Sequence, residues 1–184
     1  MTIIYLISKL LTYPAALLKA FWEHCLLKML KVAVNDTRYM QKNEMCGHVE
    51  HELTETALKS FFYCFLQGIP NFLLSLPALF VSVSNIVFFG ITPHDMTSGK
   101  VSAMFILSIV LYYVGISLWC NKSPLYEDAL NMWELIYVEK KLSMPLRVLF
   151  FIPSVLIMAG SFLERYGISL FLYTAATAVL ALIV

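Results

Sequence analysis

A short polar segment, Cys46-Gly47-His48-Val49-Glu50-His51-Glu52, stands out in a chain that is 60% hydrophobic. It contains two of the four histidines, two carboxylates and a thiol. Imidazole, carboxylate and thiol groups bind metal ions, and imidazole also takes up and releases protons near neutral pH. The segment is therefore the first candidate for a metal or proton site, although a solvated loop between two membrane helices has the same kind of composition.

Three more polar side chains lie inside the apolar stretch Pro14–Leu30. They are Lys19, Glu23 and His24, and charged groups are costly in lipid unless they pair or face a polar cavity. Lys19 and Glu23 are four residues apart, so they share one face of a helix. Asp128 begins a later helix and is the remaining candidate. The sequence therefore predicts one polar intramembrane cluster made of Lys19, Glu23, His24, His48, His51 and Asp128.

Composition indicates a membrane protein and excludes other classes. Only 14% of the 184 residues are charged, whereas soluble domains carry about 25% charged residues. The net charge of +1, without dense clusters of Lys and Arg, gives no electrostatic basis for binding nucleic acid. The four cysteines are scattered, which favours free thiols over a disulfide framework. We expect a single integral membrane domain over residues 1–184, surrounded by the lipid bilayer and retaining its N-terminal segment.

Long apolar runs locate the expected membrane spans. Tyr13-Pro14 should separate a short helix from a longer one, because proline disfavours helix in the residue before it and begins a helix well. Pro70 and Pro77 should either bend the stretch over residues 57–90 or divide it into two helices. We expect about five transmembrane segments: Pro14–Leu30, Ala57–Gly90, Val101–Cys120, Pro145–Leu163 and Ile168–Val184.

Other segments should differ from these spans. Residues 32–34 and 47–49 favour short extended pieces around an Asn35-Asp36 turn, which predicts a small β-hairpin or re-entrant strand. Asn121–Leu142 carries apolar side chains at helical spacing among charged neighbours, which predicts an amphipathic helix at the membrane interface. The expected fold class is thus an all-α polytopic membrane protein with this strand element and one interfacial helix. The aromatic group Phe61-Phe62-Tyr63 is expected to face lipid or fill packing space.

The positions of Lys and Arg predict the orientation, because these residues are retained on the cytoplasmic side. They concentrate in the two loops that carry the polar cluster, whereas the alternate loops contain only Lys100 and Arg165. This bias places Cys46–Glu52 and Ser123–Asp128 in the cytosol, beneath what we expect to be a prokaryotic cytoplasmic membrane. His94 then lies in a loop on the opposite face.

Five short motifs follow one another over residues 10–135: Tyr13-Pro14, then a helix end at Lys28-Met29-Leu30-Lys31-Val32, then Gly47-His48-Val49-Glu50-His51-Glu52, then Gly68-Ile69-Pro70-Asn71, then Ser123-Pro124 followed by Asp128-Ala129. In this order they resemble the site-2-protease-like membrane zinc metalloproteases, in particular small prokaryotic members. In that family the helix after Tyr-Pro carries H-E-x-x-H, whose two histidines bind zinc and whose glutamate acts as the general base. A later aspartate is the third protein ligand.

The resemblance implies that this chain has a degenerate zinc motif. Aligned on Tyr13-Pro14, it places Lys19 and Glu23 at the two histidine positions and Ala20 at the position of the base, whereas Asp128 keeps the aspartate position. Metal-activated hydrolysis needs a metal that acidifies a bound water and a base that takes its proton. Ala20 cannot accept a proton, and Lys19 brings a positive charge where zinc would bind. A protease of the usual mechanism is therefore not expected.

Two hypotheses follow for the polar cluster. In the first, no cofactor is bound, and the Lys19 ammonium takes the place of zinc in a buried ion pair with Glu23 and Asp128. In the second, zinc binds at a relocated site whose ligands are Glu23, His24, Asp128 and either His51 or His48, with the cysteines as further candidate ligands.

These hypotheses predict different classes of function. The first makes the protein a non-catalytic relative of the proteases that binds a membrane or extended peptide partner, with an exposed strand edge near Val49 as the binding surface. The second makes it a membrane metal-dependent hydrolase or peptidase. The intramembrane charges of Lys19 and Glu23 leave a small transporter or channel subunit as a third class. Homo-oligomers stay open as well, because Gly160-Ser161 would allow helices from two copies to approach closely.

Overall fold

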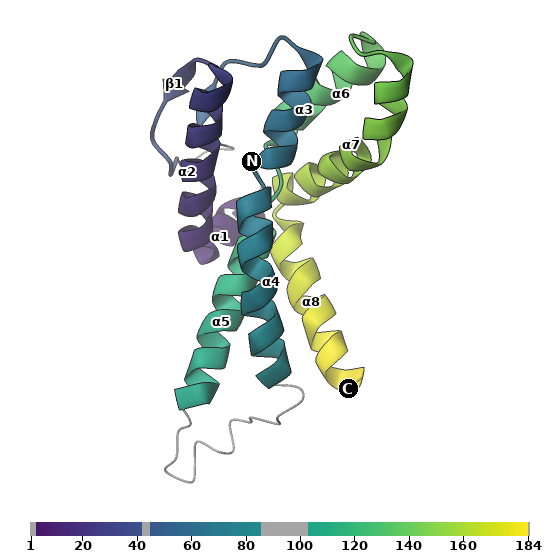
Figure 1. Ribbon diagram of the computed structural model, residues 1–184. Coiled ribbons are helices and arrows are strands. Elements are labelled where there is room, and N and C mark those ends of the chain that lie inside the picture. The colour runs from purple at the N-terminus through teal and green to yellow at the C-terminus, as the bar shows by residue number, and fades with distance from the viewer. Residues whose placement is uncertain (1–2, 42–44, 86–102, 184) are drawn as a thin grey trace.

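The computed structural model describes residues 3–41, 45–85 and 103–183, which form helices and one very small sheet (Figure 1). The expected loop with His94 and the end of the expected helix over residues 57–90 lie outside the described residues. In Figure 1, α4, α5 and α8 form the lower part of the molecule, and α2, α3 and α6 form the upper part. The helical elements are α1 (Ile3–Leu11), α2 (Tyr13–Leu30), α3 (Ala57–Leu66), α4 (Ile69–Val83), α5 (Ala103–Cys120), α6 (Tyr126–Trp133), the π-helical turn η3 (Glu134–Val138), α7 (Met144–Arg165) and α8 (Ile168–Ile183).

The break between α1 and α2 forms where Tyr13-Pro14 predicts it. Pro14 lies in the first turn of α2, where its missing N–H costs no hydrogen bond, and the two helices meet at 91°. The bend directs the buried face of each helix into the same interior. Lys9 of α1 and Lys19 of α2 are both buried there, and both pair with the same carboxylate, Glu164.

The small sheet contains two strands, β1 (Val34–Asp36) and β2 (Glu50–His51), which pair antiparallel. Val34 is aligned with His51, so the pairing fixes the position of that histidine. The predicted strand element is therefore present, but the predicted turn is wrong because Asn35 and Asp36 belong to β1. The chain turns after the strand instead, where the Asp36 carboxylate accepts hydrogen bonds from the backbone and the guanidinium of Arg38.

The junction between α3 and α4 holds the segment that follows α5. Gly68 stands at this junction, and a methyl group on it would overlap the carbonyl oxygen of Lys122, so glycine is required for the close approach. The Asn71 side chain donates a hydrogen bond of 2.8 Å to the carbonyl of Asn121. These contacts fix the chain that leads into α6, where Asp128 lies.

α6 and η3 form the segment that the sequence predicts as an interfacial helix. One face of it packs into the molecule against α3 and α7, and its buried residues are Asp128, Ala129, Met132, Leu135 and Ile136. α7 then returns beside α6 and is bent in Figure 1, with Pro153 inside the helix. As a result Gly160 lies directly against the Ser123 side chain. The segments at residues 123–128 and 164–167, which the charge bias places on opposite membrane faces, lie side by side in the structure.

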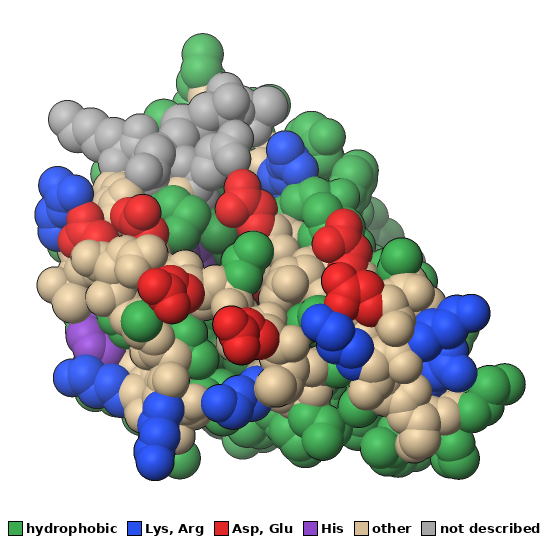
Figure 2. Space-filling model, turned by 90° about the horizontal axis from the view of Figure 1, so that it is seen from above, with side chains coloured by type: hydrophobic (Ala, Val, Ile, Leu, Met, Phe, Trp, Pro, Cys, Tyr) green, Lys and Arg blue, Asp and Glu red, His purple; other side chains and the backbone are tan. Residues whose placement is uncertain are grey.

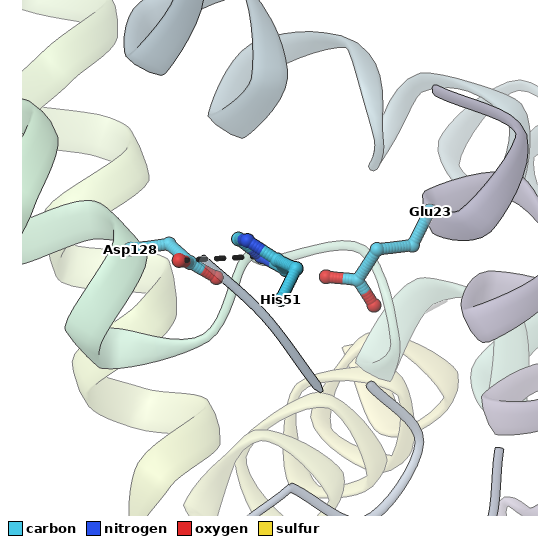
Figure 3. Close-up of side chains that lie close together, drawn as sticks. All are labelled: Glu23, His51 and Asp128. Atoms are coloured by element: carbon cyan, nitrogen blue, oxygen red, sulfur yellow. Dashed lines mark ion pairs between the residues drawn. The ribbon is translucent and has the colours of Figure 1, made fainter. Parts of the chain in front are cut away.

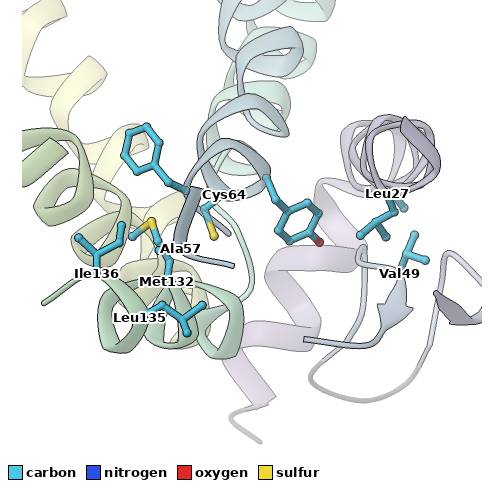
Figure 4. Packing of buried hydrophobic residues seen from close by; sticks show 10 residues of the cluster. Leu27, Val49, Ala57, Cys64, Met132, Leu135 and Ile136 are labelled. Atoms are coloured by element: carbon cyan, nitrogen blue, oxygen red, sulfur yellow. The ribbon is translucent and has the colours of Figure 1, made fainter. Parts of the chain in front are cut away.

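An apolar cluster joins the elements that carry the polar groups (Figure 4). It connects α2, β2 and its neighbourhood, α3 and α6, with Leu27 and Val49 at one end and Met132 and Ile136 at the other. Burial of these side chains holds the backbones of α2, α3 and α6 in place. The polar side chains of the site are thus presented by elements that pack through their apolar neighbours.

The rest of the molecule has polar groups inside and large apolar groups outside. Ile3, Phe80 and Ile152 are each at least 70% exposed. Within the described residues, by contrast, six Lys, Glu, Asp or His side chains are almost completely buried: Lys9, Lys19, Glu23, His48, Asp128 and Glu164. Such an arrangement suits hydrocarbon surroundings, in which charged groups must face inward and pair. Figure 2 shows the end at which charged side chains are exposed, with Asp and Glu over its middle and Lys and Arg mainly toward its rim.

Among the described residues, two helical stretches are long and apolar enough to cross a membrane, Ala57–Val83 and Met144–Arg165. The bent pair α1 and α2 would add a third. This is fewer than the five spans predicted from the sequence. The apolar helices Met104–Cys120 and Ile168–Val179 are shorter, as described, than the roughly 20 residues that a bilayer requires. The helices are consistent with a membrane protein of two or three spans.

Candidate functional site

The interior of the molecule contains a series of contacting, buried ionisable side chains, which we call the buried chain, and Lys19 lies within it. This lysine is 0% exposed. Its Nζ lies 3.1 Å from His48 Nε2 and 3.1 Å from Glu164 Oε1, and it donates a hydrogen bond to the carbonyl oxygen of Ser123. An ammonium group has three protons and no lone pair. The Lys19 ammonium therefore has one neighbouring partner for each of its three protons.

Glu164, near the end of α7, connects Lys19 to α1. Its Oε1 atom pairs with both Lys9 and Lys19 and lies 3.2 Å from His48 Nε2. Lys9 also donates a hydrogen bond of 2.7 Å to Asn121 Oδ1. A carboxylate between two lysines is paired twice, so Glu164 ties α1 and α2 to the end of α7.

Glu23 is the next member of the chain. Its Oε1 lies 3.4 Å from His48 Nδ1 and accepts a hydrogen bond of 2.5 Å from the Tyr63 hydroxyl. Its Oε2 accepts a hydrogen bond of 3.2 Å from the backbone N–H of Val49. Both oxygens of this fully buried carboxylate are thus satisfied, as burial of a charge requires. The amide of Val49 is consequently not available at a strand edge, which corrects the predicted site of peptide binding.

His51 ends the chain on the side of α6, and its surroundings define its protonation. Its Nδ1 lies 2.7 Å from the carbonyl oxygen of Glu52, which only accepts hydrogen bonds. Its Nε2 lies 2.7 Å from the Tyr63 hydroxyl, whose own proton goes to Glu23, and 3.5 Å from Asp128 Oδ1. Both ring nitrogens therefore face acceptors. Burial alone would lower the pKa of His51, but the hydrogen bond and the charge of Asp128 outweigh burial and raise the pKa to about 9.

The charged members of the chain balance one another. Three cations, Lys9, Lys19 and protonated His51, lie among three carboxylates, Glu23, Asp128 and Glu164. These six groups sum to zero charge. A balanced set of paired charges is the arrangement that lets charged groups remain in an interior of low polarity.

Three of these side chains also lie close enough together to hold a metal ion. Glu23, His51 and Asp128 each offer one ligand atom within 4.8 Å of the others, and Figure 3 shows His51 between the two carboxylates. One imidazole nitrogen and two carboxylate oxygens are ligands that zinc accepts. Binding would require His51 to lose its proton and Tyr63 to move away from the ligand atoms, because a metal ligand must offer a lone pair. The fit is therefore conditional on both changes.

The structure brings together most, but not all, of the residues that the sequence singled out. Lys19, Glu23, His48, His51 and Asp128 are linked directly or through Tyr63 and Glu164. Within the described residues, His24 forms no hydrogen bond or ion pair with the other members: it is partly buried, and its Nδ1 lies 3.2 Å from the Tyr39 hydroxyl.

The predicted ion pair of Lys19 with Glu23 and Asp128 is wrong in its partners. Lys19 pairs with Glu164, and Asp128 pairs with His51. Sequence reasoning missed the roles of Lys9, Tyr63 and Glu164. The sequence did contain a signal for Lys9 and Glu164. Each is a charged residue within or near the end of an apolar helix, and the same feature had drawn attention to Lys19. No signal distinguished Tyr63 from its neighbouring aromatic residues.

Cysteines do not add to the candidate site. All four cysteines are free thiols, as the scattered spacing predicts. Burial raises the pKa of the Cys46 thiol, which makes the metal-binding thiolate form less accessible.

Comparison with known proteins found no matching family model, no matching curated protein and no matching solved structure. The functional argument therefore depends on the geometry of the buried chain.

Replacing Glu164 by Ala should reduce the free energy of unfolding by about 3–5 kcal/mol, because it leaves two buried lysines without their carboxylate. The measurement is reversible unfolding of the purified protein in detergent micelles or nanodiscs. Glu139→Ala is the control, since Glu139 is about half exposed and pairs with Lys141 at the surface, where a pair contributes about 1 kcal/mol or less. Equal stability of the two variants would contradict the pairing of Glu164 with the lysines.

Stability should also depend on the proton of His51. Since the folded pKa of about 9 lies above the ordinary 6.5, the His51–Asp128 contribution is complete below pH 6.5 and is lost as the pH rises through about 9. The charge partners are Asp128 on α6 and Glu23 on α2, with the Tyr63 hydroxyl from α3. We expect a loss of about 2–3 kcal/mol between pH 6.5 and 10, measured by unfolding.

Asp128→Asn is the control for this pH dependence, because it keeps the shape of the side chain and removes its charge. The difference between the wild-type and variant stability curves should be largest below pH 6.5 and should vanish near pH 10. Parallel curves over this range would show that Asp128 does not hold the proton on His51.

Proposed function

We propose that this protein is a non-catalytic membrane protein built like a site-2-protease-like metalloprotease, with a lysine in place of the metal. The observation that carries the proposal is the position of the Lys19 ammonium. It lies within hydrogen-bonding distance of His48, Ser123 and Glu164 at the centre of the buried chain. A second cation in the same place would meet strong repulsion from this lysine.

The position expected for the general base supports the same function. Ala20 is 0% exposed and forms part of the apolar cluster, so its side chain offers no proton acceptor at that position. Hydrolysis needs a group that takes a proton from the attacking water. Lys19 and Glu23 already use their donors and acceptors on neighbouring groups, which supports a structural role for them.

A peptide partner fits the edge of β1 better than the segment around Val49. The amide of Val49 is bonded to Glu23, whereas β1 pairs with β2 on one side and has the exposed residue Asn35 at its centre. An extended peptide adds to a sheet edge through backbone hydrogen bonds. We place the bound segment along Val34–Asp36, at the end of the molecule where charged side chains are exposed (Figure 2).

A second candidate function, a metal-dependent hydrolase with a relocated site, is favoured by the proximity of Glu23, His51 and Asp128. Glu23 and Asp128 would supply oxygen ligands and His51 a nitrogen ligand, and the metal would acidify a bound water. In this case Lys19 would remain paired with Glu164 and would take no part in metal binding.

Metal content discriminates between the two functions. The wild-type protein, purified and dialysed against buffer with zinc and then without it, should retain almost no zinc. The double variant Lys19→His with Glu23→His should retain about one zinc ion per chain, because two histidines and Asp128 then form a three-ligand site. Adding Asp128→Asn to this variant should abolish retention. One zinc per wild-type chain that is lost in His51→Ala would overturn the non-catalytic function in favour of the hydrolase.

Peptide binding at β1 is tested by photocrosslinking. A benzophenone amino acid at Asn35 should form adducts with an extended peptide partner in native membranes, and the adduct sites should fall within one short segment of the partner. The same group at Lys141, which is exposed in the segment after η3, should not react with that segment. Equal labelling from both positions would show random contact and would remove β1 as the binding edge.

A further inference from the structure

Lys122, which is not part of the buried chain, has its ammonium group among three aromatic rings. Its Nζ lies 3.6 Å from the ring centre of Trp119. The ring centres of Phe72 and Tyr173 lie 5.3 Å and 5.4 Å from the same atom. All three distances are within the roughly 6 Å at which the face of an aromatic ring attracts a cation. We call Phe72, Trp119 and Tyr173 the aromatic cage.

The aromatic cage is built from the three helices of the lower part of the molecule (Figure 1). Phe72 belongs to α4, Trp119 to the last turn of α5 and Tyr173 to α8, and α5 packs against both of the other helices. The ring centre of Trp119 is 5.2 Å from that of Phe72 and 5.6 Å from that of Tyr173. The rings therefore support one another, and the cage is largely pre-formed, as binding sites for small molecules usually are.

Lys122 is a poor chemical match for the aromatic cage that it fills. An ammonium group has three N–H donors, and within the described residues Lys122 Nζ has neither a hydrogen-bond acceptor nor a carboxylate partner. Aromatic faces attract the charge but do not replace the hydrogen bonds that an ammonium makes in water. Burial accordingly lowers the pKa of Lys122 below its ordinary value.

A quaternary ammonium group matches the same rings better. Its nitrogen carries carbon substituents and no N–H donor, so it needs no acceptor, and aromatic cages are the usual means of recognising it. Phe72 and Tyr173 lie farther from Nζ than Trp119 does. A cation larger than the lysine ammonium can therefore be centred between the three rings instead of directly against Trp119.

The displaced lysine decides what must accompany the quaternary ammonium. The backbone at Lys122 is fixed by its close approach to Gly68, whereas the side chain is half-buried and has a flexible stem. The lysine ammonium can thus leave the cage but stays beside it. A ligand with only a positive charge would be repelled by this neighbour, whereas a ligand with an adjacent anionic group would pair with it.

We propose that the aromatic cage binds a zwitterionic quaternary ammonium compound, with phosphocholine as its simplest probe. The trimethylammonium group occupies the cage, and Lys122 swings out and pairs with the phosphate, which a short ethylene linker joins to the quaternary nitrogen. Until the ligand arrives, Lys122 is an internal occupant that reduces the apparent affinity. The site shares no residue with the buried chain or with β1, so it is independent of the proposed non-catalytic function.

The test is isothermal titration calorimetry of the purified protein in a maltoside detergent, which has no ammonium group. The probes are phosphocholine, phosphoethanolamine and choline. We expect phosphocholine to bind about tenfold more tightly than either of the others, because phosphoethanolamine lacks the quaternary nitrogen and choline lacks the phosphate. Equal affinity of phosphocholine and choline would overturn the pairing of Lys122 with the anion.

A lipid headgroup and a free compound can both supply phosphocholine, so a second arm compares phosphatidylcholine with phosphatidylethanolamine of the same acyl chains. Binding to the delipidated protein is measured by native mass spectrometry. Preference for the choline compound in both arms supports recognition of the headgroup itself, and preference in the lipid arm alone supports a lipid ligand. No preference for choline over ethanolamine in either arm would overturn the proposal.

Variants of the rings locate the bound cation. Trp119→Leu should abolish the preference for choline over ethanolamine, and Trp119→Phe should reduce it, because the ring of Phe attracts a cation less than that of Trp. Trp133→Leu, in α6 and outside the cage, should keep it. Equal effects of Trp119→Leu and Trp133→Leu, or full preference in both Trp119 variants, would show that the probe binds elsewhere.

The lysine gives a result that a merely structural residue would not. Lys122→Met removes the internal occupant, so choline should bind about fivefold more tightly, while the advantage of phosphocholine over choline should disappear. Lys141→Met is the control, because Lys141 is exposed and pairs with Glu139 at the surface, and it should change neither affinity. Weaker binding of choline in Lys122→Met would overturn the role of Lys122 as an occupant of the cage.

Discussion

The structure depends on one constraint: a charge that faces an apolar interior must find a partner there. Lys9, Lys19, Glu23, Asp128 and Glu164 come from α1, α2, α6 and α7, and all are at most 5% exposed. Removing any one of them from its partner leaves a buried charge, which is more costly than the pair is stabilising. The pairing therefore contributes specificity: it selects one arrangement of helices whose outer surfaces, being apolar, offer little to distinguish one packing from another.

The lysine at the centre differs from a metal ion in what it demands of its neighbours. A zinc ion withdraws electrons from its ligands and acidifies a bound water. An ammonium group directs three hydrogen bonds and carries one charge, so it holds His48, Ser123 and Glu164 in place without activating any of them. The two candidate functions also differ in the state of His51, because its ring nitrogens both face hydrogen-bond acceptors and a metal ligand would have to lose its proton.

The sequence predicted which residues form the site better than it predicted which of them pair with one another. The cost of burying charge correctly directed attention to Lys19 and Glu23, and the motif around residues 123–129 to Asp128. Pairing was predicted between the wrong partners, because Lys19 and Glu164 are 145 positions apart and nothing local indicates that the bend of α7 returns its end to α2. Tyr63 was predicted to face lipid or fill packing space. The sequence alone does not distinguish a tyrosine that only packs from one whose hydroxyl donates a hydrogen bond to a buried carboxylate. Within the described residues, fewer helices than predicted are long enough to cross a membrane, because hydropathy detects apolar surroundings and short apolar helices share them.

Glu164 connects the two halves of the molecule, and this position has a physical consequence. One of its oxygens holds both Lys9 of α1 and Lys19 of α2. A change in the charge of this carboxylate therefore changes the strength with which α1 and α2 are both held to the end of α7. Because the two lysines share one acceptor, their pairings are not independent, and a shift of either helix alters the pairing of the other. A single buried carboxylate is sufficient to join three helices whose outer surfaces are apolar.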